Sequence, residues 1–82
     1  MTDALGNTII LNSRYCYVYI SDAYLIKHCK VIEILEDEGL VKVQNLHIDA
    51  VIKGELIQNY DDPKRVSRMT PFKLIPVTDE QW

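Results

Sequence analysis

Three tyrosines occur at alternate positions in one short stretch, separated by a thiol and two aliphatic residues: Tyr15, Cys16, Tyr17, Val18, Tyr19 and Ile20. Successive side chains of a β-strand point to opposite faces, so the tyrosines would share one face. The thiol and aliphatic side chains are the drier set. We expect them to turn toward the core and leave the tyrosines in solvent, where they could anchor a protein partner or stack on unpaired bases. The alternative is that the first residues, or the tail with Trp82, cover the tyrosines.

Basic side chains are concentrated in one region: Lys64, Arg65 and Arg68, with Lys73 beyond them. These residues could contact phosphate groups or an acidic partner. On a strand, however, Lys64 and Arg68 would point to one face and Arg65 to the other. The alternative is a solvated strand edge, where positive charge prevents pairing with another chain.

The nitrogen and sulfur ligands available to a metal ion are two histidines and two cysteines: Cys16, His28, Cys29 and His47. No pair has the spacing of a zinc site, so we expect no metal and no cofactor. His47 and Asp49 would project from one face of a strand, as an acid–base pair could. No motif supplies a nucleophile or a second base, and we therefore expect no enzymatic activity.

The elements that position these residues are expected to be strands. The chain has 82 residues, 48% of them hydrophobic, and a formal net charge of −3. The length and hydrophobic content are enough for one small core, and the negative net charge excludes a strongly basic nucleic-acid binder. Isoleucine and valine are far more common than alanine, which favours strands over helices. We expect a single domain over residues 1–82, with flexible ends at 1–7 and 78–82.

Residues 22–38 fit a helix or a strand hairpin. As a helix that ends at Gly39, this stretch would scatter its apolar residues around the axis instead of forming one stripe. A β-hairpin over about residues 29–45 fits better, because Gly39 suits the left-handed position that closes a short loop. A helical turn at 22–27 could still precede the hairpin.

Six to eight short strands, with turn signals about every ten residues, predict an all-β fold in the form of a small barrel. Residues 29–77 contain a strand, an acidic hairpin tip, two more strands, the kink Met69-Thr70-Pro71 and a closing strand. This order resembles SH3-like small barrels such as Tudor and KOW modules, and the resemblance implies a 3-10 turn near residue 70. The chain lacks the glycine that KOW modules have ahead of the hairpin and the four-aromatic cage of Tudor modules. The resemblance therefore implies a fold and assigns no functional residue.

The first residues have neither the positive nor the apolar region of a secretory signal, and no segment is apolar enough to cross a bilayer. We expect a cytoplasmic protein with reduced cysteines, located in the host cytoplasm if a phage encodes it. The leading interpretation is a non-enzymatic protein-binding module, an adaptor or inhibitor of a larger protein machine, that binds through the tyrosine face. The alternative is a small barrel that binds single-stranded nucleic acid by tyrosine stacking and the basic cluster. Homo-oligomerisation is compatible with either.

Overall fold

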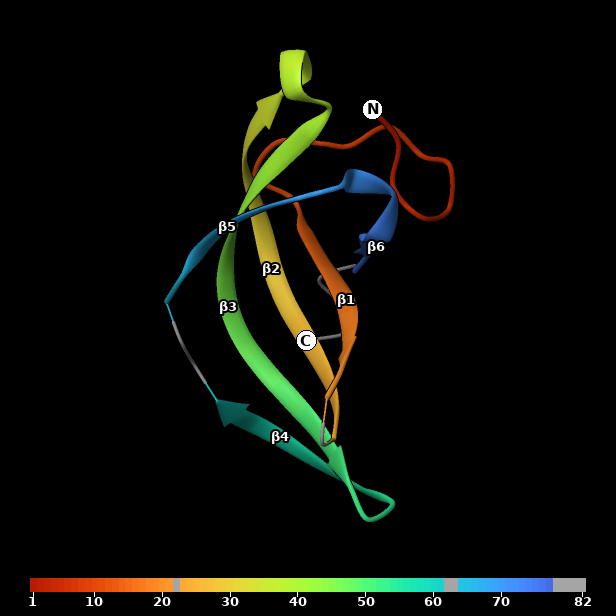
Figure 1. The fold of residues 1–82 in the computed structure, drawn as a ribbon, viewed down its shortest axis with the longest axis vertical. Coiled ribbons are helices and arrows are strands. Elements are labelled where there is room, and N and C mark those ends of the chain that lie inside the picture. The colour runs from red at the N-terminus through yellow and green to blue at the C-terminus, as the bar shows by residue number, and fades with distance from the viewer. Residues whose placement is uncertain (22, 62–63, 78–82) are drawn as a thin grey trace.

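The protein folds as a single antiparallel sheet in a computed structural model, which describes residues 1–21, 23–61 and 64–77. The six strands are β1 (Arg14–Ile20), β2 (Tyr24–Leu35), β3 (Leu40–Ile52), β4 (Glu55–Asp61), β5 (Val66–Met69) and β6 (Ile75–Pro76). Two 3-10 turns, η1 (Glu36–Glu38) and η2 (Pro71–Lys73), join β2 to β3 and β5 to β6. The strand order is β4-β3-β2-β1-β6, and β5 also pairs with β3 (Figure 1).

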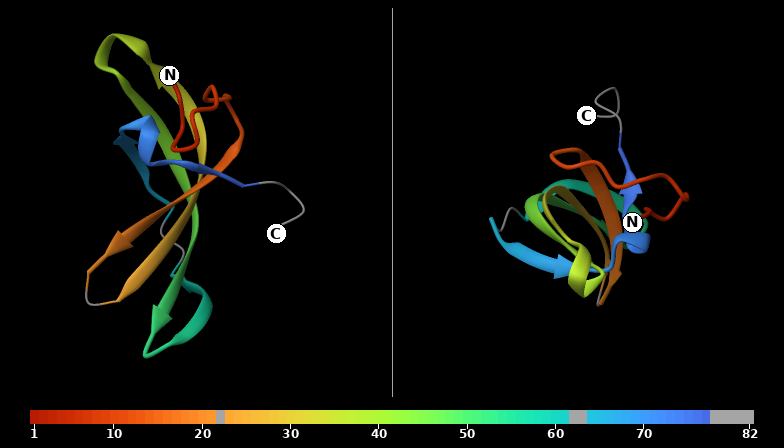
Figure 2. Two further views of the ribbon diagram at one scale, coloured as in Figure 1. Left: turned by 90° about the vertical axis from the view of Figure 1, so that its right-hand side faces the viewer. Right: turned by 90° about the horizontal axis from the view of Figure 1, so that it is seen from above.

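The prediction of a small all-β fold is confirmed, and so is the 3-10 turn near residue 70, which is η2. The sheet curls strongly (Figure 2). Within the described ranges no ladder joins β6 to β4 or β5, so the barrel stays open. The helical turn considered at 22–27 is wrong for residues 24–27, which belong to β2. They pair with β1 on one side and β3 on the other, and these two ladders outweigh a local helical turn.

The predicted hairpin over 29–45 is confirmed and extends further, because β2 and β3 pair from Leu35↔Leu40 at the tip to Tyr24↔Val51 at the base. Gly39 closes the tip with φ +68°, as expected for a left-handed loop residue. Two register shifts interrupt the ladder, one between Val31 and Glu33 and the other between His28 and Cys29. Each is a β-bulge, which turns the side chains that follow it to the other face.

The core occupies one end of the sheet. Its buried residues are Ile9, Tyr15, Cys29, Val31, Val41, Val43 and Leu74. Residues 1–7, which the sequence predicts to be flexible, form a hydrogen-bonded loop at this end. The N–H of Ala4 donates to the carbonyl of Leu74 at 2.8 Å, and the buried Asp3 carboxylate accepts hydrogen bonds from two N–H groups of its own loop. The predicted flexible end at 78–82, with Trp82, lies outside the described residues.

The other end of the sheet consists of the β1–β2 and β3–β4 hairpin ends, which diverge in Figure 2. Every residue of β4 is exposed, and β1 is exposed from Val18 onward. In the described ranges there is no helix of the length and apolar character needed to cross a membrane. The two long strands β2 and β3 therefore connect a buried end to an exposed one.

Candidate functional site

Strand β1 directs its side chains to the opposite faces from those expected. The outer face, meaning the face of the sheet away from the core, carries Cys16, Val18 and Ile20, and the core face carries Tyr15, Tyr17 and Tyr19. Tyr15 is only 2% exposed. The prediction that it faces solvent is wrong, because its hydroxyl accepts a hydrogen bond from the N–H of Ile10 and the ring can enter the core without an unsatisfied polar group.

Tyr17, which packs against the core, and the more exposed Tyr19 continue along the core face beside Lys27 of β2. The Nζ atom of Lys27 lies 5.9 Å from the centroid of the Tyr17 ring and 4.6 Å from that of Tyr19. Both distances are within the range of cation–π attraction. The two rings therefore already contact a cation, whereas the sequence predicted a bare aromatic surface.

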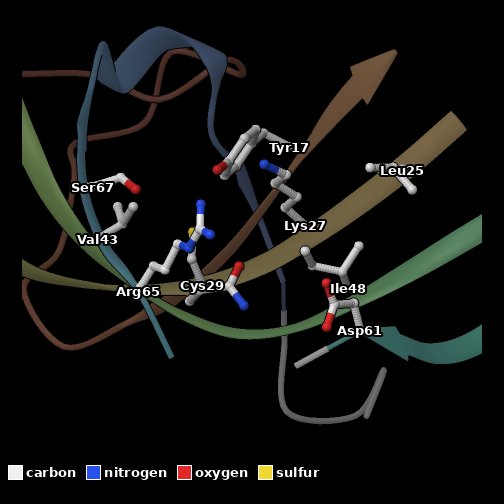
Figure 3. Close-up of a pocket in the computed structure, with 10 residues that line it drawn as sticks. Tyr17, Leu25, Lys27, Cys29, Val43, Ile48, Asp61, Arg65 and Ser67 are labelled. Carbon is white, nitrogen blue, oxygen red and sulfur yellow. The ribbon is translucent and has the colours of Figure 1, made fainter. Parts of the chain in front are cut away.

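A cleft of about 260 Å³ opens on the core face next to Tyr17. Its polar lining includes Lys27, Arg65, Asp61 and Ser67, and Figure 3 shows Arg65 reaching into it from the segment before β5. Burial raises the pKa of the Tyr17 hydroxyl above its ordinary value, so this group is a hydrogen-bond donor in the cleft. The cleft thus offers two cations and hydroxyl groups beside one carboxylate.

The basic residues predicted to act together make different contacts in the structure: Lys64, Arg65, Arg68 and Lys73. The Nζ atom of Lys64 donates to the carbonyl of Leu46 at 3.2 Å. Arg68 on β5 pairs with Glu38 of η1 at 3.1 Å. Only Arg65 among the four lines the cleft beside Tyr17.

The outer face carries an apolar surface that the sequence analysis did not find. Ile20 pairs with Tyr24, Tyr24 with Val51, and Val51 with Leu56, so one row of four apolar side chains crosses four strands. The neighbouring pair Val18↔Ile26 extends the row. We call this set the outer patch: Val18, Ile20, Tyr24, Ile26, Val51 and Leu56. Ile20, Tyr24 and Leu56 are 67%, 57% and 56% exposed, so the patch is open to solvent.

A shallow groove runs between the two hairpin ends at the border of the outer patch. Its walls include Ile20 and Tyr24 from the first hairpin, and Val51 and Ile52 from the second. The groove is mostly apolar, with Lys53 at its edge. Exposed apolar surface of this kind is typical of a protein–protein interaction site.

The middle of the outer face holds two histidines and a carboxylate. His28 of β2 pairs with His47 of β3, and their rings stack with centroids 4.3 Å apart. The Nε2 atom of His28 lies 3.1 Å from Oδ2 of Asp49, and Nε2 of His47 lies 3.8 Å from Oδ1. Burial lowers the pKa of His28, and the neighbouring His47 lowers it further, while Asp49 partly opposes both effects. The balance of these effects favours the neutral form of His28.

His47 and Asp49 share one face of β3, as predicted from the sequence, but the convergence of His28 on them was not predicted. The spacing along the chain carries no signal for this cluster, because the two histidines meet across strands. A signal lay in the hairpin: counting outward equally from the tip pair Leu35↔Leu40 leads to the pair His28↔His47.

No family model matches the chain, and neither curated proteins nor solved structures include a significant match to it. The SH3-like resemblance therefore stays a prediction, and the functional argument depends on the surfaces described above.

Proposed function

We propose that this protein is a non-enzymatic protein-binding module, an adaptor or an inhibitor, whose recognition surface is the outer patch. The observation that carries the proposal is the cross-strand row from Ile20 through Tyr24 and Val51 to Leu56, in which every side chain except the half-buried Val51 is exposed. These apolar side chains do not pack against the core of the protein. Removing them from water at an interface with a partner lowers the free energy and so favours binding.

Tyr24 is the expected centre of the interface. It lies between Ile20 and Val51 in the row, and its side chain is 57% exposed. Tyrosine is enriched among residues that dominate binding energy, because its ring buries a large area at a small cost in conformational entropy. The partner is a protein that presents an apolar surface of its own to this row.

The test compares the wild type with Tyr24→Lys in affinity capture, followed by measurement of the dissociation constant with the purified partner. Phe72→Lys is the matched control, because Phe72 is 62% exposed on η2 and lies outside the patch. We expect Tyr24→Lys to weaken binding by about tenfold or more and Phe72→Lys to leave it unchanged. A partner that binds the Tyr24→Lys variant as tightly as the wild type would refute the proposal. Light scattering of the protein alone would show whether a second copy occupies the patch.

A second candidate function, binding of single-stranded nucleic acid, is favoured by the cleft that Tyr17 shares with Lys27 and Arg65. An aromatic ring beside two cations could stack on a base and hold its phosphate. Fluorescence anisotropy of a labelled oligonucleotide at several salt concentrations would test this function. It predicts affinity that falls with salt and with Arg65→Ala but not with Lys73→Ala, since Lys73 lies outside the cleft.

A further inference from the structure

Two imidazoles and one carboxylate converge on the outer face, at the middle of β2 and β3. One ligand atom from each of His28, His47 and Asp49 lies within 4.8 Å of the other two. His28 Nε2 lies 3.1 Å from Asp49 Oδ2, and His47 Nε2 lies 3.8 Å from Asp49 Oδ1. In a tetrahedral zinc site with bond lengths near 2.1 Å, ligand atoms lie about 3.4 Å apart. The separations suit one ion, and binding it would require the two imidazoles to rotate out of their parallel stack, because the lone pair of a ring nitrogen lies in the plane of the ring.

We propose that His28, His47 and Asp49 form a binding site for a divalent transition-metal ion of the zinc class. Each imidazole would supply one nitrogen and Asp49 one carboxylate oxygen, and water would complete the coordination. Nitrogen-rich ligand sets of this kind favour zinc and its neighbours over Mg²⁺ and Ca²⁺, which prefer oxygen ligands throughout.

The surroundings hold these side chains in place while leaving the site accessible. The three side chains are 14%, 22% and 14% exposed, in the order His28, His47 and Asp49, so they are mostly packed but reach solvent. They project from two strands that pair directly, and this fixes their relative positions.

The carboxylate also has a partner outside the site. The N–H of Asn59 donates a hydrogen bond of 2.9 Å to Oδ1 of Asp49. Asn59 has φ +53°, a left-handed conformation within the register shift of the β3–β4 ladder. Hydrogen bonds of this kind orient a ligating carboxylate, and they are a common feature of metal sites in proteins.

The experiment is a calorimetric titration of chelator-treated protein with Zn²⁺ in the presence of excess Mg²⁺. We expect one ion per chain. Asp49→Asn keeps the shape of the side chain and its acceptor for the Asn59 N–H, but it removes the anionic ligand. We expect it to weaken Zn²⁺ binding by about tenfold or more. Asp37→Asn, the same substitution in the exposed turn η1, should have no effect.

A second readout uses the fact that the chain has only two histidines. Nitrogen-15 NMR spectra of the imidazoles should show both rings shifting together at one equivalent of Zn²⁺. Circular dichroism of each variant checks that it is folded. Cys16 of β1 pairs with His28 of β2, so by register it is the nearest other candidate ligand. Cys16→Ser is therefore a further control, and it should leave the Zn²⁺ affinity unchanged.

Equal Zn²⁺ affinity in the wild type and Asp49→Asn would overturn the proposal, and so would unshifted imidazole signals. A loss of affinity in Cys16→Ser as large as that in Asp49→Asn would overturn the assigned ligand set. None of these measurements involves a protein partner, so the outcome is independent of the proposed function.

Discussion

The backbone N–H of Ile10 donates a hydrogen bond of 3.0 Å to the hydroxyl oxygen of Tyr15, which is the largest fully buried side chain among the described residues. This bond joins the segment before β1 to the core and satisfies the polar end of an otherwise apolar contact. It explains how a tyrosine, and not its aliphatic neighbours, comes to fill the centre of the domain.

Removing only this hydroxyl should destabilise the protein measurably. We expect Tyr15→Phe to lower the free energy of unfolding by about 1 kcal/mol, because the N–H of Ile10 loses its partner. Urea denaturation provides the measurement, with Tyr19→Phe as the control, since Tyr19 is half exposed on the same strand. Equal stability of the two variants would show that the bond contributes nothing.

Two leucines at opposite ends of the sheet should respond very differently to truncation. Leu74 is fully buried in the core, whereas Leu56 is 56% exposed in the outer patch. We expect Leu74→Ala to cost about 2–5 kcal/mol of unfolding free energy and Leu56→Ala no more than about 0.5 kcal/mol. A large loss for Leu56→Ala, measured by thermal unfolding, would mean that the outer patch stabilises the fold and is not available to a partner.

Gly39 should be sensitive to substitution for a backbone reason alone. Its φ is +68°, and a Cβ atom added there would meet nothing within 4 Å. We expect Gly39→Ala to lower stability by about 1 kcal/mol, and Gly39→Asn to lower it less, because asparagine tolerates this conformation better. Chemical denaturation of both variants would test the order, and a more stable Gly39→Ala would contradict it.

The two thiols should differ in reactivity in the folded protein. Burial raises the pKa of Cys29 to about 12. Cys16 of β1 lies on the outer face of the sheet, opposite to Cys29, and is partly exposed. We expect an alkylating reagent at pH 8 to modify Cys16 first and to reach Cys29 only after unfolding, because only the thiolate reacts. Equal rates, followed by mass spectrometry, would contradict this assignment.

The same pKa shift predicts how stability depends on pH in the alkaline range. The folded state holds the Cys29 proton more tightly than the unfolded chain, whose thiol has a pKa near 9.0. The contribution of this thiol to stability is therefore complete below pH 9 and decreases as the pH rises toward 12. Cys29→Ala should show a smaller loss of unfolding free energy over that interval, measured against its own value at pH 8.

The hairpin could be predicted from the sequence because its signals are local. Gly39 and the acidic tip mark the turn, and β-branched residues mark the strands on either side. The two bulges could not be predicted, although they matter greatly. One inserts Ile32 into β2 and the other Leu46 into β3, so the two shifts cancel and the register beyond them is restored. This cancellation places His28 opposite His47.

The orientation of β1 was the wrong part of the prediction, and its cause is not local. The side chains that alternate with the tyrosines are more apolar: Cys16, Val18 and Ile20. If one face of β1 were buried along its whole length, this difference would direct them to the core. Only the first part of β1 touches the core, however, and the N–H group that donates to the Tyr15 hydroxyl belongs to the segment before the strand. The outer patch could not be predicted for a related reason, because its side chains come from four strands and form one row only in the folded sheet.

One end of strands β2 and β3 packs in the core, and the other end carries the exposed outer patch. Substitutions on the outer face of the open end would therefore leave the interior untouched, whereas Ile48 and Ala50 of the same half are buried on the core face. A library that randomises Ile20, Tyr24 and Leu56 while keeping Val31, Val41 and Leu74 should retain folded members in high proportion. Such a chain could serve as a small scaffold from which new binding specificities are selected.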